Sequence, residues 1–138
     1  MKKILLSFLL LLFFTSLIFA QQKEHKIIFD YAKGDTASFA TMIRQAKNIM
    51  NTVPDAKLEI VCHGPGLDML VNDKTTVQKE IEELHGKFNV VFAACGATMQ
   101  RRGIEKIQLL PLTVVVPLAN LEFSSKQQQG WSYIKAGY

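Results

Sequence analysis

The hydrophobic residues of this chain fall into short unbroken runs, separated by segments in which they recur at helical spacing. The runs cover residues 26–31, 58–63, 88–95 and 112–117, each about the length of a strand. Runs without alternation, separated by helices, are typical of a parallel sheet. The pattern predicts an α/β protein: a single flavodoxin-like or Rossmann-like domain with a mostly parallel sheet and helices on both faces.

The two clearest helices are amphipathic. Between Phe39 and Val53 the apolar residues are three or four positions apart, which places them on one face. Asp35 or Thr36 can cap this helix, and Pro54 ends it. A second, more polar helix is expected over residues 77–86, with Gly86 as its end.

The remaining segments are shorter. Gly64-Pro65-Gly66 suits a type II turn, and a short helix is expected over residues 67–71. Another helix begins at Gly96, directly after the third strand. Residues 121–134 look helical, but Gly130 weakens that helix, so the alternative is that residues 131–134 are extended.

The N-terminus has the pattern of a secretory signal. Lys2 and Lys3 precede an uncharged apolar run, and the best cleavage position follows Ala20. We therefore expect a signal peptide over residues 1–20 and a domain over residues 21–138. The alternative, an uncleaved anchor, is disfavoured because the run is shorter than the roughly 18–20 residues that span a bilayer. The predicted location is outside the cytoplasm, most simply the periplasm, with no stable membrane anchor after cleavage.

Removal of the signal peptide lowers the formal net charge from +4 to +2, because its only charged side chains are two lysines. The remaining basic residues are scattered among acidic ones rather than gathered on one segment. This distribution does not favour nucleic-acid binding. Scattered lysines of this kind are Lys47, Lys57, Lys74 and Lys87.

Two cysteines remain, Cys62 and Cys95, and in an oxidising compartment the simple expectation is a disulfide. The fold argues against it. With a strand order of 2-1-3, the strands that carry the two cysteines flank the first strand and lie about 9 to 10 Å apart. A disulfide requires Cα atoms within roughly 7 Å. We therefore predict two free thiols, with Cys95 the more exposed.

Cys95 is the leading candidate for chemistry. It stands between a buried strand and a helix whose first turn is Gly96-Ala97-Thr98, where amide N–H groups and the helix dipole favour a thiolate. Gly96 permits a tight turn and leaves room for a small group on the sulfur. Arg101 and Arg102 add positive potential, but about 9 Å of helical rise makes direct pairing with the sulfur unexpected. The simpler interpretation is that Cys95 is only a small, buried apolar residue.

His63 follows the second strand, just before Gly64. It could bind an anion, shuttle a proton or stabilise a persulfide; the alternative is a loop histidine bonded to backbone. Because successive strand residues point to opposite faces, a His63 in the site implies that Cys62 lies in the core. A metal site built from Cys62, His63 and Cys95 is not expected, because zinc ligands usually have wider, paired spacings.

Several function classes have no support. The chain has no Walker loop, no G-x-G-x-x-G after its first strand, no G-x-S-x-G and no H-E-x-x-H. Nucleotide binding, serine hydrolysis and zinc proteolysis are therefore not indicated, and no cofactor is expected.

Three segments together carry a family resemblance. VVFAACGATMQRRGI, residues 90–104, resembles the DsrE/DsrF-like sulfur-relay family, in which a cysteine closes the third strand and Arg-Arg-Gly follows a short helix. EIVCHGPGLDML, residues 59–70, and QQQGWSYIKAG, residues 127–137, are similar to a small stand-alone branch of that family.

The resemblance implies a flavodoxin-like domain that forms homo-oligomers, often trimers or hexamers. It also implies that Cys95 carries sulfur as a persulfide or acts in a sulfurtransferase-like way. The sulfur would come from a donor protein or a small sulfane-sulfur compound and would pass to an acceptor protein. His63 would assist, and the site would include Gly64, Gly96, Ala97, Thr98 and Arg101.

Two other functions remain open at this point. One is a non-catalytic oligomeric module that binds a small ligand at the same place. The other is a redox-sensing thiol that cycles through sulfenic acid or a mixed disulfide. The sulfur-relay hypothesis requires that the sulfur of Cys95 be ionised and reachable.

Overall fold

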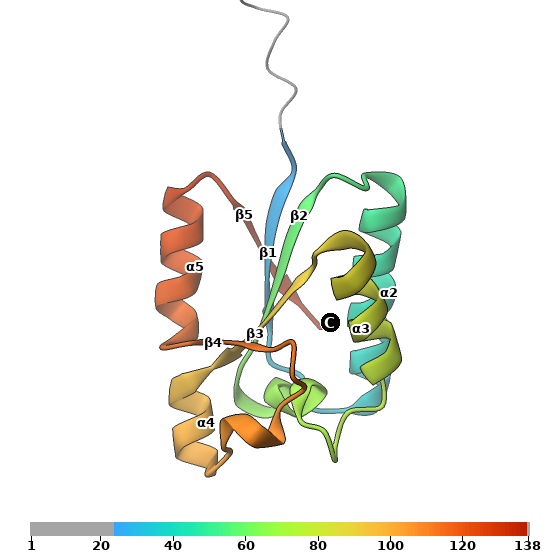
Figure 1. The fold of residues 1–138 in the computed structure, drawn as a ribbon. Coiled ribbons are helices and arrows are strands. Elements are labelled where there is room, and N and C mark those ends of the chain that lie inside the picture. The colour runs from blue at the N-terminus through green and yellow to red at the C-terminus, as the bar shows by residue number, and fades with distance from the viewer. Residues whose placement is uncertain (1–23, 138) are drawn as a thin grey trace, which may run out of the picture.

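The computed structural model describes residues 24–137, which form one parallel sheet between two layers of helices (Figure 1). The predicted signal peptide lies outside the described residues. Within residues 24–137, none of the helices combines the length and apolar character needed to cross a membrane. The strands are β1 (Lys26–Tyr31), β2 (Lys57–Cys62), β3 (Val91–Cys95), β4 (Val114–Val116) and β5 (Ser132–Ala136). The helices are α2 (Thr36–Thr52), η1 (Gly64–Leu70), α3 (Gln78–Phe88), α4 (Gly96–Arg102), η2 (Lys106–Gln108) and α5 (Ala119–Gln128).

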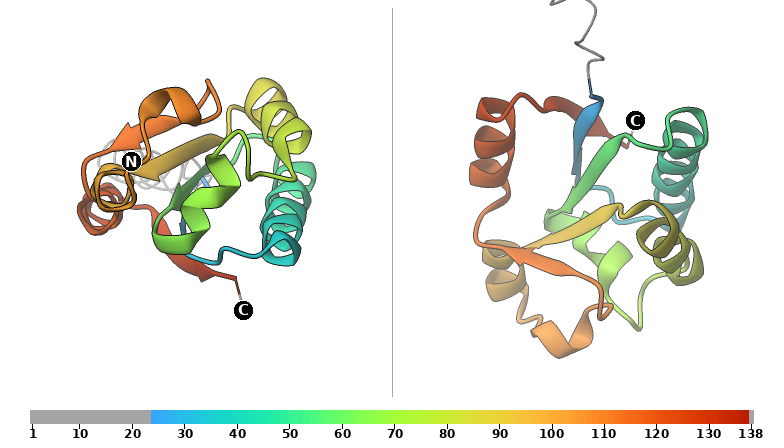
Figure 2. Two further views of the ribbon diagram at one scale, coloured as in Figure 1. Left: turned by 90° about the horizontal axis from the view of Figure 1, so that it is seen from below. Right: turned by 45° about the horizontal axis from the view of Figure 1, so that its top comes forward.

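The five strands are all parallel, in the order β4-β3-β2-β1-β5. The α/β class and the parallel sheet are therefore confirmed, but the 2-1-3 order is wrong because β2 lies between β1 and β3. From β1 to β4 each new strand is added on the same side of its predecessor. The chain then returns through α5 and adds β5 on the other side of β1 (Figure 2). Sequence periodicity defines strands but carries no information on which strands become neighbours.

Each face of the sheet has its own apolar cluster. The larger one packs under α2 and α3 and includes Phe39, Ile60, Cys62 and Phe92. A smaller one packs under α5 and includes Cys95. The two cysteines therefore lie on opposite faces of the sheet, and both are free thiols. The prediction of free thiols is confirmed for a different reason: orientation, rather than strand separation, keeps them apart.

Local cues identified α2 correctly. The side chain of Asp35 accepts a hydrogen bond of 2.8 Å from the amide of Ser38, so Asp35 is the N-cap. The end of α3 was predicted wrongly, because the helix continues through Gly86 to Phe88. Asn89, in the left-handed region with φ of 56°, provides its C-cap. The run 88–95 is therefore strand only from Val91.

The C-terminal segment adopts the alternative in which the residues after Gly130 are extended. α5 ends at Gln128, and β5 follows after a turn in which Gly130 has φ of 84°. Residues 64–71 also differ from the prediction: one 3₁₀ helix, η1, replaces a turn followed by a helix. Its first residue, Gly64, has φ of 51°, a conformation that a non-glycine residue adopts rarely.

Candidate functional site

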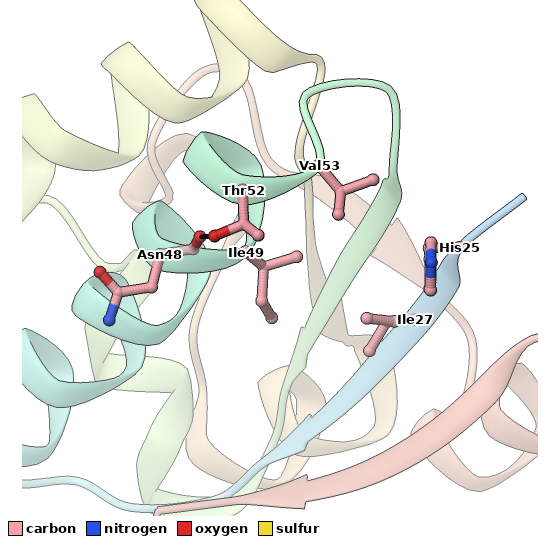
Figure 3. Close-up of a pocket in the computed structure, with 6 residues that line it drawn as sticks. All are labelled: His25, Ile27, Asn48, Ile49, Thr52 and Val53. Carbon is pink, nitrogen blue, oxygen red and sulfur yellow. Dashed lines mark hydrogen bonds between the residues drawn. The ribbon is translucent and has the colours of Figure 1, made fainter.

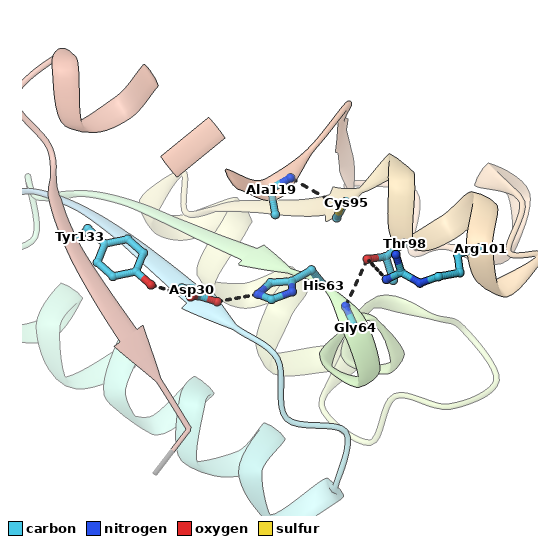
Figure 4. A network of polar contacts seen from close by, with 8 residues as sticks. All are labelled: Asp30, His63, Gly64, Cys95, Thr98, Arg101, Ala119 and Tyr133. Carbon is cyan, nitrogen blue, oxygen red and sulfur yellow. Dashed lines mark hydrogen bonds and ion pairs between the residues drawn. The ribbon is translucent and has the colours of Figure 1, made fainter. Parts of the chain in front are cut away.

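The polar side chains of the site come from four neighbouring strands, at or near the carboxyl ends of β1, β2 and β3 and near the start of β5. Tyr133 lies on β5, Asp30 on β1, His63 directly after β2, and Cys95 at the end of β3 (Figure 4). All four point toward the face that α5 covers. Ligands of open α/β sheets bind beyond the carboxyl ends of the strands. The topology brings the two sequence-predicted residues, Cys95 and His63, together in that region.

The sulfur of Cys95 is covered but well provided with hydrogen-bond donors. The residue is 3% exposed, against 0% for Cys62, so it is the more exposed cysteine by a narrow margin. Its Sγ accepts a hydrogen bond of 3.4 Å from the amide of Ala119, at the start of α5. The hydroxyl and amide of Thr98 and the amide of Ala97 also donate toward the sulfur.

Thr98 is oriented toward the sulfur by its own partners. Its Oγ1 accepts hydrogen bonds from the amide of Gly64 at 3.2 Å and from Nη2 of Arg101 at 3.4 Å. A hydroxyl has two acceptor positions and one hydrogen to donate. With both acceptor positions used, the hydrogen is available to the sulfur of Cys95. Arg101 therefore acts on the site through Thr98, without direct pairing to the sulfur.

These donors set the ionisation of Cys95. Burial alone would raise the pKa of the Cys95 thiol, but the hydrogen bonds from Thr98, Ala119 and Ala97 together lower it below the ordinary value. Cys62 has no such donors, and burial raises its pKa far above the ordinary value. The thiolate therefore forms more readily at Cys95 than at Cys62.

The difference between the two thiols can be measured directly. Iodoacetamide, added to the folded protein without reductant, is expected to modify Cys95 and to leave Cys62 unmodified until the protein is unfolded. Peptide mass spectrometry identifies the modified residue. Faster modification of Cys62 than of Cys95 in the folded state, or a native bridge between them, would contradict this prediction.

Gly96 and Ala97 hold the β4–α5 connection against the site. A Cβ on Gly96 would lie 3.2 Å from the carbonyl oxygen of Val116 and 3.4 Å from that of Pro117. The amide of Ala97 donates to the carbonyl of Pro117 at 3.1 Å. The space beside Gly96 is thus filled by this connection, which differs from the expectation that it leaves room for a group on the sulfur.

A carboxylate that sequence reasoning missed lies beside His63. Oδ1 of Asp30 is 2.6 Å from Nε2 of His63, and Oδ2 accepts a hydrogen bond of 2.6 Å from the hydroxyl of Tyr133. Because Asp30 lies within an apolar run, the sequence pattern indicates only a strand residue and does not identify Asp30 as a partner of His63. A signal was available: an acidic residue in a buried parallel strand is rare without a partner.

The second arginine of Arg-Arg-Gly has a separate task. Nη1 of Arg102 donates to the carbonyl of Gly64 at 3.0 Å, and Nη2 contacts Oδ1 of Asp68 at 2.7 Å. These bonds join α4 to η1. Gly103, with φ of 63°, is the left-handed C-cap of α4. The motif therefore fixes the short helix that follows Cys95.

The site does not resemble a metal centre. No group of three His, Cys, Asp or Glu side chains within residues 24–137 is placed to hold a metal ion. Cys62, one of the three ligands considered from sequence, points to the opposite face from Cys95.

A hollow in the surface lies away from these residues. It has a volume of about 360 Å³ and lies between α2 and the first residues of β1 (Figure 3). Asp30 is near the other end of β1, so this hollow is separate from the Cys95 site. Its lining residues are His25, Ile27, Asn48, Ile49, Thr52 and Val53.

Comparison with known families decides the relationship. The model of the DsrE/DsrF-like family matches residues 25–136, nearly the whole described domain. The chain belongs to the DsrE/DsrF-like family. The resemblance drawn from three sequence segments is therefore confirmed, and family membership supports a sulfur-relay type of role at the level of the family.

Two solved structures with this fold are similar to the chain. MTH1491 of Methanobacterium thermoautotrophicum, a protein of unknown function, is 25% identical with a TM-score of 0.76; the match covers 81% of this chain and 99% of MTH1491. YchN of E. coli is 16% identical with a TM-score of 0.66, covering 80% of this chain and 98% of YchN. The YchN match shows the fold alone. No curated protein matches the chain significantly.

Proposed function

We propose that this DsrE/DsrF-like protein carries sulfane sulfur as a persulfide on Cys95. The observation that supports it most is the set of donors around the sulfur: one hydrogen bond of 3.4 Å from Ala119 and additional donors from Thr98 and Ala97. They stabilise negative charge on a thiolate and equally on a terminal persulfide sulfur, since both are anionic acceptors.

With thiosulfate as donor the step is balanced without another reactant. The Cys95 thiolate attacks the outer sulfur of thiosulfate and forms a new S–S bond. The S–S bond of thiosulfate breaks, and sulfite leaves with the electron pair. The products are an anionic persulfide on Cys95 and sulfite. Because Cys95 is 3% exposed, small donors of this kind fit the covered sulfur better than bulky disulfides do.

The test is sulfur loading followed by intact mass. The purified protein is incubated with thiosulfate or polysulfide, separated from excess reagent and weighed, and one added sulfur atom is expected. The added sulfur must disappear on treatment with cyanide or a thiol reductant, which removes sulfane sulfur but leaves sulfinic and sulfonic acids unchanged.

The same measurement separates the two other functions. Uptake of oxygen atoms after peroxide, without uptake of sulfur, favours a redox-sensing thiol. Absence of any adduct favours a small-ligand binding module. The geometry gives the redox sensor less support, because the other cysteine, Cys62, lies on the opposite face of the sheet from Cys95 and cannot resolve an oxidised sulfur there.

We also propose that the protein is exported and assembles into a homo-oligomer, a trimer or a hexamer. Seven large apolar side chains in residues 24–137 are exposed, and five of them lie between residues 107 and 121. Exposed apolar side chains of this size are candidates for an oligomer contact. These five are Ile107, Val114, Val115, Leu118 and Leu121. Export predicts that the mature protein, recovered from the periplasm, begins at Gln21.

A charge in the apolar surface is expected to disrupt the assembly. Leu121 is 64% exposed on α5, so glutamate in its place leaves the monomer folded but puts an uncompensated charge into the contact. Light scattering after gel filtration should show a lower mass for Leu121→Glu. Gln127→Glu, on the exposed last turn of the same helix, should behave as wild type. A monomeric wild-type protein, or an unchanged mass for Leu121→Glu, would contradict the proposal.

A further inference from the structure

We propose that Asp30 and Tyr133 are positioning residues that hold His63 in the Nε2–H tautomer, which leaves Nδ1 to move a proton at the Cys95 sulfur. This inference rests on the proposed function for its chemistry, and on independent geometry for the arrangement itself. Neither Asp30 nor Tyr133 belongs to the sequence-derived site.

The carboxylate of Asp30 is held at both oxygens. Asp30 is 9% exposed, and a carboxylate so buried requires partners. One oxygen lies 2.6 Å from Nε2 of His63 and the other 2.6 Å from the hydroxyl of Tyr133. Both distances are short, as expected for hydrogen bonds to a charged carboxylate. Because a carboxylate only accepts, the proton of a neutral His63 must lie on Nε2.

Packing fixes the plane of the ring. The imidazole of His63 meets the ring of Phe123 edge to face, with centroids 6.2 Å apart and an interplanar angle of 68°. Phe123 in turn meets Tyr133 at 5.4 Å and 75°. Phe123 on α5 therefore supports both side chains that contact Asp30. A ring held by one hydrogen bond and one aromatic contact has little freedom to turn.

Sheet register places His63 beside Cys95. Cys62 pairs with Ala94 in the parallel ladder of β2 and β3, and His63 and Cys95 are the residues that follow these two in the chain. Adjacent strands are about 5 Å apart. The hydrogen bond from the amide of Gly64 to Oγ1 of Thr98 keeps the two strand ends together. His63 is also the link to solvent, since its side chain is 29% exposed and Cys95 is covered.

In this position His63 completes a transfer from a small organic persulfide. Nδ1 takes the proton of the Cys95 thiol, and the thiolate attacks the outer sulfur of the persulfide. A new S–S bond forms, the old one breaks, and the departing thiolate receives the proton from Nδ1. One thiol and one persulfide are consumed, and one thiol and one persulfide result. In this proposal Asp30 orients His63, and His63 serves as the acid–base group for the nucleophile on the neighbouring strand, Cys95.

Nitrogen NMR tests the geometry without any sulfur chemistry. At a pH high enough for a neutral ring, the ¹⁵N shifts of His63 are expected to show a protonated Nε2 and a bare Nδ1. His63→Gln identifies the signals. In Asp30→Asn the preference for this tautomer should weaken or reverse, whereas the exposed control Asp55→Asn should leave it unchanged. A wild-type ring protonated on Nδ1, or an unaffected ring in Asp30→Asn, would overturn the inference.

Sulfur-loading rates test the function of the arrangement. Against a small organic persulfide, loading should slow about 100-fold in His63→Ala, the scale of a lost general acid–base group. It should slow about tenfold in Asp30→Asn and less in Tyr133→Phe, which keeps the packing against Phe123. Added imidazole should restore part of the rate in His63→Ala, but not when Asp30→Asn is also present, because nothing then orients the added ring.

The outcomes separate this inference from the proposed function. A wild-type protein that takes up no sulfur removes the proposed function, while the nitrogen shifts still decide whether Asp30 sets the tautomer. A wild-type protein that loads normally, together with full rates in Asp30→Asn and Tyr133→Phe, would overturn the positioning role alone. Melting temperatures of the variants show whether a slow rate arises from a loss of folding.

Discussion

Replacement of Cys95 by serine is expected to abolish sulfur loading, while Cys62→Ala loads as fully as the wild-type protein. The reason is the difference in environment between the two thiols. Hydrogen bonds from Thr98 and Ala119 lower the pKa of Cys95 against the effect of burial, and Cys62 is fully buried on the opposite face with a raised pKa. Intact mass after incubation with polysulfide measures both variants.

The Cys95→Ser variant is well suited to this comparison because serine preserves the size of the side chain and can accept the same hydrogen bonds. Its thermal unfolding should stay close to that of the wild-type protein. Cys62→Ala removes a single sulfur from the larger core cluster and should cost about 1 kcal/mol or more in stability. Persistence of the added sulfur in Cys95→Ser, or its loss in Cys62→Ala alone, would place the sulfur-carrying residue elsewhere.

The amino-acid sequence predicts the local parts of this site well. Cys95 lies at a strand-to-helix junction, as the apolar run before it and the glycine after it indicated. Local propensity also identified α2 and its cap. These features depend on residues a few positions apart, which a single sequence displays directly.

The parts that sequence reasoning missed depend on neighbours distant in the chain. Asp30 and Tyr133 are 103 positions apart and meet only because β5 is added beside β1. Strand order determines that contact, and the order assumed from sequence was wrong. Arg102 was grouped with Arg101 as a source of positive potential, yet its partners are Gly64 and Asp68 on η1.

At the opposite end of the sheet, a buried ion pair holds α5 in place. Nζ of Lys126 lies 2.6 Å from Oε2 of Glu59 and 4.4 Å from the ring centroid of Trp131. Glu59 is 2% exposed. The first turn of the same helix contributes Ala119, and the middle Phe123, to the surroundings of Cys95 and His63. The position of the site therefore depends on an interaction near the far end of α5.

Lys126→Met is expected to lower the free energy of unfolding by about 3 kcal/mol at neutral pH, because it leaves the Glu59 carboxylate buried without its partner. Burial already raises the pKa of Glu59, against the opposing effect of Lys126. The folded state thus binds a proton more readily than the unfolded chain, so stability falls as pH rises through the titration of Glu59. In Lys126→Met the pKa of Glu59 should be raised further, so the variant should lose more stability than the wild-type protein as pH rises through the titration of Glu59. Below the ordinary carboxyl pKa of 4.5 it should approach the wild-type protein.

Urea unfolding at several pH values measures this effect, and two variants make it specific. Glu59→Gln combined with Lys126→Met should recover most of the lost stability, because no buried charge remains. Lys47→Met breaks the exposed pair with Glu83, 2.9 Å long, and should cost less than about 1 kcal/mol. If Lys126→Met cost no more than Lys47→Met, the buried pair would not hold α5. The sulfur-loading rate of Lys126→Met, measured where the variant is folded, then shows how far the Cys95 site depends on this helix.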